Sequence, residues 1–380
     1  MTHFLSRSGA GLFARAPLFF IRLLVTSAIA AGTLGFSAQA GSSNVQGPKA
    51  GFGGVPSTPS CRSLPLAVGN VDTAVDDANL NDLKLALNDL EAAFATEDSK
   101  LFHNLAHPSI HQTLSKSKLI FESVFPTYGL VKPKITRASL YELTFPVTTK
   151  TVEVECSGGR ARGVVGPERQ YMVQHTAFSK NEQMRITTIF APIPKAVREL
   201  NKAKYGIGIV MFHTQAWSHE QKTPVGLIEE ARKWNRLKSP VVAWMFAEAA
   251  KRILDSNPYF APRETSEALL LADELKTQLP QVEKVNGALR GSESSWNFLG
   301  FTMVYQGYGV EPGFYFRMKE GEVLNQSLDK CRQHVALVLP QVKELRDRFH
   351  GVECLPFSPA ENISAAPAGG TMFVPWAELK

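Results

Sequence analysis

The hydrophobic pattern of this chain changes its period within its first half. Between residues 78 and 125, apolar side chains recur every three or four positions, as in Leu83, Leu87 and Leu90, which is the spacing of one face of a helix. From residue 135 to residue 190, apolar and polar side chains alternate, which is the spacing of a half-buried strand. Helices followed by a run of long strands predict an α+β unit in which a helix covers one face of an antiparallel sheet.

One helical stretch resembles a known superfamily. Residues 87–98 read LNDLEAAFATED, and they are followed by His107-Pro108-Ser109 and by the expected strands. This arrangement resembles the NTF2-like superfamily of cone-shaped α+β domains, over residues 78–192. The resemblance implies a curved sheet wrapped around a long helix, with a cavity at the open end. Because the superfamily includes isomerases and dehydratases as well as binding and dimerisation modules, it does not fix a function.

The first 40 residues have the composition of an export signal. They contain three arginines and no Asp or Glu, then an apolar run over residues 23–34, and then the small-residue end Ala38-Gln39-Ala40. These are the parts of a cleavable signal peptide. An organelle transit peptide is one alternative. An uncleaved membrane anchor is another, although Arg22 would lie inside a span already shorter than about 20 apolar residues. We predict export to the periplasm or the cell exterior, with cleavage near Ala40.

The net charge gives no indication of a nucleic-acid partner. The whole chain carries +6, but the leader contributes three arginines, so the remainder has 38 basic and 35 acidic residues, or +3. No run of five or more like charges occurs, and such runs are typical of nucleic-acid-binding segments. No second apolar run approaches the length of a membrane span, so the mature chain is not expected to cross a membrane.

The chain has four cysteines, Cys61, Cys156, Cys331 and Cys354. An even number in an exported chain indicates two disulfides, for which three pairings are possible. Four buried free thiols are the alternative. The sequence leaves the pairing open.

An expected helix restricts one of these pairings. If Ser327–Phe349 formed one straight helix, Cys331 and Phe349 would lie about 27 Å apart. The five residues that lead from Phe349 to Cys354 reach back only about 17 Å. A bond between Cys331 and Cys354 therefore requires a break in the helix, and Pro340 can supply it.

Changes in composition divide the chain into six segments. They are a signal peptide (1–40), a Gly/Ser/Pro-rich lead-in (41–77), the NTF2-like domain (78–192), an α-helical domain (195–284), a β-hairpin plus helix (285–355) and a Pro/Ala/Gly-rich tail (356–380). The stretch Tyr205–Phe212 fits a short strand or the continuation of a buried helix. The aromatic hairpin formed by Trp296–Tyr305 and Gly313–Met318 fits a ligand surface or the core of a small sheet.

Three histidines at four-residue spacing form a candidate metal site. On a continuous helix, His103, His107 and His111 would align three imidazoles on one face, as in a zinc site. Pro108 argues against a continuous helix, and no Cys or carboxylate lies at a matching offset. The alternative is that these are surface and helix-end histidines.

A second polar group contains His213, His219 and Glu220. The sequence from His219 begins like the zinc-protease motif H-E-x-x-H but has Thr223 at the last position. The second helical ligand is missing, so the metalloprotease interpretation fails. A polar site built from these three residues in another geometry remains a candidate.

The sequence leaves two functions open. It has no P-loop, dinucleotide-binding loop or nucleophile elbow, and we predict no cofactor. Cys156 beside His175 would be a nucleophile only if it were reduced, whereas export favours a disulfide. The first function is a non-catalytic protein of the cell envelope that binds a protein partner or a small apolar ligand. The second is an exported hydrolase or isomerase with its site in the cone cavity or near His213 and His219.

Overall fold

The structure is a computed structural model, and the residues that it describes lie between residues 58 and 379. The described ranges are 58–66, 78–111, 118, 120–127, 130, 133–146, 152–164, 168–178, 183–219, 221–290, 296–306, 309–321, 327–359 and 371–379. The expected signal peptide and Glu220 lie outside them.

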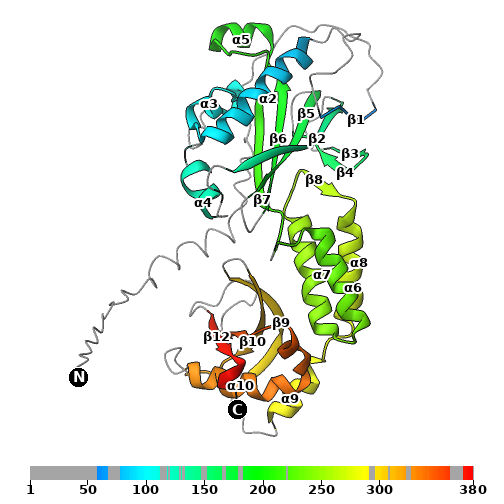
Figure 1. Ribbon diagram of the computed structural model, residues 1–380, viewed down its shortest axis with the longest axis vertical. Helices are drawn as coiled ribbons and strands as arrows, with labels where there is room; N and C mark the ends of the chain where they lie inside the picture. Colours follow the sequence, from blue (N-terminus) through cyan, green and yellow to red (C-terminus); the bar gives the residue numbers. More distant parts are fainter. Residues whose placement is uncertain are drawn as a thin grey trace, which may run out of the picture. The chain divides into compact units, whose positions relative to one another are not determined.

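The first half of the described chain forms a helix-covered antiparallel sheet (Figure 1). Its five strands lie in the order β1 (Ser60–Ser63), β2 (Lys134–Thr144), β5 (Arg169–Phe178), β6 (Gln183–Pro192) and β7 (Ile207–Ala216). Helix α2 (Ala78–Thr96) buries Leu83, Leu87, Leu90 and Phe94 in a core that it shares with this sheet. The α+β class predicted from the change of period is confirmed, and membership of the NTF2-like superfamily stays a prediction.

The sheet extends beyond both expected domain boundaries. Strand β1 lies in the segment expected to be a lead-in, and β7 lies after residue 192. The stretch Tyr205–Phe212 was ambiguous because β7 is buried on both faces over Ile207–Met211. A strand buried on both faces is a continuous apolar run, which periodicity alone does not distinguish from a buried helix.

Short helical turns connect α2 to the strands. Asp98 caps helix α3 (Ser99–His103) by accepting from the backbone N–H groups of Lys100 and Leu101, both at 2.9 Å. The other turns are η2 (Pro108–Ile110), η4 (Ile120–Val124) and α4 (Phe125–Thr127).

A small three-stranded sheet joins the first half of the chain to the helices that follow it. Its strands lie in the order β3 (Glu153–Cys156), β4 (Gly159–Arg162) and β8 (Phe260–Pro262). Gly159 has φ +149°, and a Cβ at this position would lie 2.2 Å from the backbone oxygen of Ala261. Only glycine allows the two backbones to approach so closely.

Helices make up most of the next segment. They are α5 (Lys195–Asn201), α6 (Pro224–Arg236), α7 (Pro240–Asp255), α8 (Glu264–Lys276) and α9 (Val282–Arg290). The expectation of an all-helical segment was wrong at β7 and β8. The three residues of β8 are too few for a period to be visible in the sequence.

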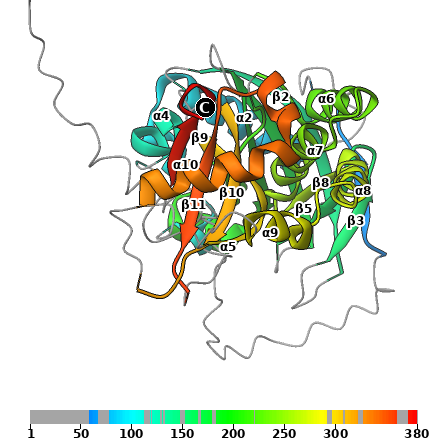
Figure 2. The same cartoon turned by 90° about the horizontal axis from the view of Figure 1, so that it is seen from below.

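The C-terminal part forms a four-stranded sheet in the order β12 (Met372–Pro375), β11 (Gly351–Phe357), β10 (Gly309–Arg317) and β9 (Asn297–Gln306). Helix α10 (Ser327–Val338) lies across one face of this sheet (Figure 2). The hairpin is confirmed, and its rings at Trp296, Phe298, Phe314 and Phe316 are buried in a core shared with α7. The segment 356–380 was expected to be only a tail, but β12 and the turn η8 (Trp376–Glu378) are ordered in it because β12 pairs with β11.

Two disulfides join the four cysteines, Cys61 to Cys156 and Cys331 to Cys354. Helix α10 ends at Val338, and the turns η6 (Leu339–Gln341) and η7 (Lys343–Asp347) reverse the chain. The predicted break at Pro340 is confirmed, because η6 contains this proline.

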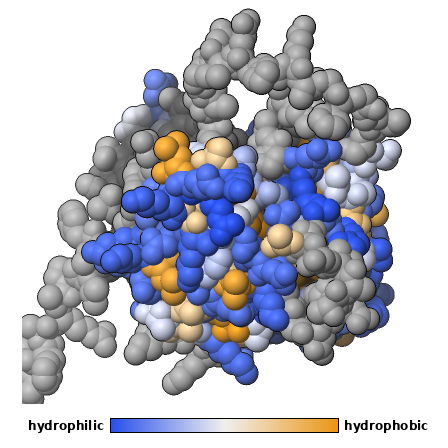
Figure 3. Space-filling model, turned by 90° about the horizontal axis from the view of Figure 1, so that it is seen from above, coloured by the Kyte–Doolittle hydropathy of each residue, from blue (hydrophilic) through white to orange (hydrophobic). Residues whose placement is uncertain are grey.

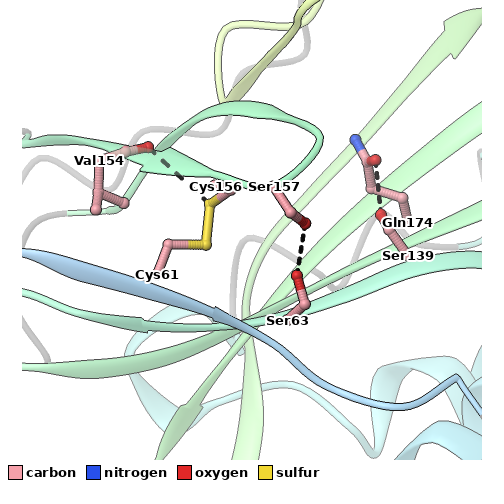
Figure 4. Close-up of a disulfide and its surroundings, with 7 residues drawn as sticks. All are labelled: Cys61, Ser63, Ser139, Val154, Cys156, Ser157 and Gln174. Atoms are coloured by element: carbon pink, nitrogen blue, oxygen red, sulfur yellow. Dashed lines mark hydrogen bonds between the residues drawn. A yellow bond between two sulfur atoms is a disulfide. The ribbon is translucent and has the colours of Figure 1, made fainter.

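The first disulfide attaches β1 to the hairpin of β3 and β4 (Figure 4). Beside it, the hydroxyl oxygens of Ser63 and Ser157 lie 2.6 Å apart. The lead-in is therefore fixed at Cys61.

Candidate functional site

The face of the first sheet opposite α2 carries a row of polar side chains. Ser139, Gln174, Thr187 and His213 are successive cross-strand partners on β2, β5, β6 and β7, so their side chains lie side by side on one face. The Ser139 hydroxyl donates to Gln174 Oε1 at 2.8 Å (Figure 4). Gln174, Thr187 and His213 are buried. Buried polar groups need hydrogen-bonding partners, and the row finds them on the helical segment.

Asn257, which follows α7, bonds to the centre of this row. Its Nδ2 donates to Thr187 Oγ1 at 2.9 Å. Its Oδ1 accepts from the backbone N–H groups of Tyr259 and Phe260 at 2.9 and 3.2 Å. One buried amide therefore fixes both the sheet and the turn that leads into β8.

His213 and Gln215 bond the end of α7 to strand β7. The imidazole Nε2 of His213 donates to the carbonyl oxygen of Ser256 at 3.0 Å. Gln215 Nε2 donates to the carbonyl oxygen of Ile253 at 2.9 Å. Burial lowers the pKa of His213, although the bond to Ser256 raises it. His213 therefore acts as a neutral anchor for the helix end.

The second histidine of this candidate group has a different environment. The backbones of His219 and Lys222 exchange two hydrogen bonds of 2.8 Å, and Gln221 between them has φ 64°. Across the part of the chain that the structure describes, no three His, Cys, Asp or Glu side chains are placed to hold a metal ion. The candidate polar group of His213, His219 and Glu220 stays a prediction, because Glu220 lies outside the described residues.

The partly buried environment of His219 predicts a pH effect. Burial, with a smaller contribution from the charge of Arg252, lowers the pKa of His219 from 6.5 to about 4. Between about pH 4 and pH 6.5, the His219 side chain of the unfolded chain binds a proton that the same side chain of the folded protein does not bind. The free energy of unfolding therefore falls as the pH falls, by up to about 1 kcal/mol per pH unit. We expect His219→Gln to reduce this slope of the free energy of unfolding against pH. The slope is measured by urea unfolding at several pH values between about 4 and 6.5.

His350, which is exposed, provides the matched control. We expect His350→Gln to keep the slope of the native protein. An identical slope in the His219→Gln variant would contradict the prediction.

The candidate zinc face at the end of α3 is not formed by the described residues. The rings of His103 and His111 lie 4.0 Å apart between centroids. The chain turns at Pro108, and the Nδ1 atom of His107 instead accepts from the backbone N–H of Ser109 at 3.2 Å. Helix α3 ends at His103, and Pro108 begins the separate turn η2, so the three imidazoles do not align.

The nucleophile alternative is excluded because the sulfur of Cys156 is bonded to Cys61. His175 lies on the other face of the sheet, where its Nε2 is 3.0 Å from Glu91 Oε1. Arg137 Nη2 donates to the same oxygen at 2.6 Å. Burial raises the pKa of Glu91, but the bonds from His175 and Arg137 outweigh it and lower the pKa overall.

This second cluster is exposed at its carboxylate end only. The side chain of Glu91 is 35% exposed, whereas that of His175 is 0% exposed. A base that acts on a substrate must be reachable from the substrate's position, and here the imidazole lies behind the carboxylate. The geometry fits an anchor between α2 and the sheet. Arg137 Nη1 also donates to the carbonyl oxygen of Leu66 at 2.6 Å.

Arg185 is the residue that sequence reasoning missed. It lies between Thr176 and Gln215 in the next cross-strand row of the outer face. The centre of its guanidinium lies 4.1 Å from the centroid of the Trp217 ring. Its Nε is buried without a hydrogen-bond partner in the described structure, and so is Gln215 Oε1. The available signal was a single charged residue in a strand of otherwise apolar and hydroxyl-bearing residues, MRITTIF.

The pKa of Arg185 reflects this environment. Burial lowers it to about 10, and the electrostatic interactions with Tyr141 and Glu264 offset only part of this effect. The guanidinium is thus a cation in a poorly solvated position, which is unfavourable without a partner.

Comparisons with known proteins give no relative for this chain. No family model matches it, and neither do any curated proteins or solved structures. Among the helices that the structure describes, none combines the length and the apolar character that crossing a membrane requires. Any statement about function therefore rests on the geometry described above.

Proposed function

We propose that this chain is an exported protein of the cell envelope that acts by binding, either to a protein partner or to a small ligand, without catalysing a reaction. The observation that carries the proposal is that the groups suited to chemistry are used in internal bonds. Cys156 is in a disulfide, His213 donates to a backbone carbonyl, and His175 bonds to Glu91. These are the contacts of a rigid scaffold.

The disulfides support the expected compartment. Disulfides form and persist in oxidising spaces such as the periplasm and the cell exterior. Both bonds of this chain join segments distant in sequence, with separations of 95 and 23 residues. The proposal of export combines this observation with the composition of residues 1–40.

The competing function, an enzyme with its site in a cone cavity, is less well supported. The space between α2 and the sheet holds a cluster of aromatic rings around Phe94. On the face seen in Figure 3, hydrophobic side chains are scattered among hydrophilic ones. The first observation favours a filled core over an open cavity, and the second gives no broad apolar surface on that face.

The proposal is tested on the native protein purified from fractionated cells. We expect the protein in the envelope or secreted fraction, with its amino terminus near Gly41 and both disulfides oxidised. We also expect metal analysis to find no stoichiometric metal. Native mass spectrometry under gentle conditions then shows which species is bound.

Two results would contradict the proposal. One is a cytosolic protein that begins at Met1 and has reduced thiols. The other is a stoichiometric metal that is lost when His213 or His219 is replaced by glutamine, which would favour a metalloenzyme.

A further inference from the structure

Arg185 differs from the other arginines that lie on the first sheet. Arg62 and Arg169 bond to Glu142, and Arg137 bonds to Glu91. The side chain of Arg185 makes no hydrogen bond or ion pair with the described residues, although its Nε is completely buried. A poorly solvated charge without an acceptor is costly to keep. An anion supplied from outside the chain would pair with the charge and lower this cost.

The surroundings of the guanidinium leave it suited to an anion. Trp217 covers one face of the planar group, and this contact leaves the N–H donors in the plane of the group available. Arg185 as a whole is only partly buried, so an anion approaches from the Nη end. Parallel N–H donors at fixed spacing match the two oxygens of a carboxylate.

The local charges favour a singly charged ligand. Glu264 and Tyr141 both act electrostatically on Arg185, but Glu264 forms no ion pair with it within the described structure. One cation with a carboxylate nearby suits a monoanion better than a doubly charged phosphate. The Nε2 of Gln215, a cross-strand neighbour of Arg185, is already bonded to the carbonyl oxygen of Ile253, so Arg185 is the donor that this position offers to an anion.

We propose that Arg185, stacked on Trp217, binds the carboxylate group of a small monocarboxylate ligand. This inference rests on the proposed binding function and names the chemistry of its ligand. The alternative is that the contact with Trp217 is purely structural.

The two possibilities differ in the effect of removing the charge. If the stacked guanidinium is structural, Arg185→Gln lowers the stability of the ligand-free protein. If the guanidinium is kept for a ligand, the same change removes an unpaired buried charge, so stability stays the same or rises while binding is lost. Stability and binding therefore have to be measured on the same variants.

The test uses isothermal titration calorimetry on the mature, oxidised protein, with acetate, benzoate and inorganic phosphate as probes. We expect saturable binding of at least one carboxylate, tighter than that of phosphate. We expect Arg185→Gln to weaken this binding at least about tenfold, which corresponds to 1.4 kcal/mol. Thermal melting without ligand should show no loss of stability. Arg160→Gln, which changes an arginine on the β3–β4 hairpin paired with Glu153 and Glu155, is the matched control and should bind normally.

Arg185→Lys keeps the charge and removes the planar fork, so it decides the question if Arg185→Gln does not fold. We expect it to weaken carboxylate binding several-fold. Three results would overturn the inference: no carboxylate binding by the native protein, unchanged binding in both variants, or phosphate binding tighter than carboxylate binding. If native mass spectrometry finds a bound species that Arg185→Gln retains, the proposed function stands and this assignment falls.

Discussion

Replacing Cys61 and Cys156 together by alanine is expected to lower the free energy of unfolding by about 4–5 kcal/mol. The bond closes a loop between residues 95 positions apart, and in the chain-entropy model long loops gain the most from a cross-link. The bond also attaches β1, which has only four residues. Losing it should free this strand from the edge of the sheet, which also weakens the ion pair between Arg62 and Glu142.

Urea unfolding of the oxidised native protein and the double variant measures this loss. The matched control is Cys331→Ala with Cys354→Ala, whose bond spans 23 residues, and for which the same model gives about 3–4 kcal/mol. A smaller loss from the first pair than from the second would contradict the argument from loop length.

Phe94→Ala is expected to lower the free energy of unfolding by about 3–5 kcal/mol. The ring is fully buried and lies at the centre of an aromatic cluster, with neighbouring ring centroids 5.9 to 6.4 Å away. Its neighbours are Phe102, Phe121, Phe125, His175 and Phe212. Truncation leaves a cavity that a helix fixed on a sheet closes only in part, which is why the cost exceeds the transfer free energy of the ring.

Phe94→Leu is the control for this prediction, because it keeps most of the volume and should cost much less. Both variants are measured by urea unfolding at neutral pH. A loss below about 1 kcal/mol for Phe94→Ala would mean that the ring borders an open space rather than a packed core, and would favour the cavity enzyme over the binding module.

The strands with a clear alternation could be predicted from the sequence, and the others could not. The long strands β2, β5 and β6 lie within the alternating stretch, residues 135–190, to within two residues at its ends. In contrast, β1 reads SCRS and is mostly exposed, so its position depends on long-range pairing with β2 and on a disulfide. The parallel pairing of β10 with β11 also joins distant segments, and no local pattern encodes it.

Contacts between segments distant in the sequence also decided which residues of the candidate site could be predicted. His213 was selected because imidazoles often carry chemistry, but its role depends on Ser256, which lies 43 residues later. Arg185 was passed over because a single arginine in an alternating strand is usually a surface residue. Only the folded chain shows that it lies against Trp217 without an acceptor. Helical spacing, by comparison, identified Pro340 correctly because the argument involved only distances along the local chain.

The hydrogen bonds between the outer polar row and the end of α7 restrict how the helical segment can move on the sheet. Apolar contacts tolerate small sliding displacements, whereas directional bonds from His213, Gln215 and Asn257 are satisfied in a single register. A shift of one residue would leave all three groups buried and without partners at once. Any separation at this junction should therefore occur as one cooperative step, and slow hydrogen exchange at these side-chain amides would share a common opening rate.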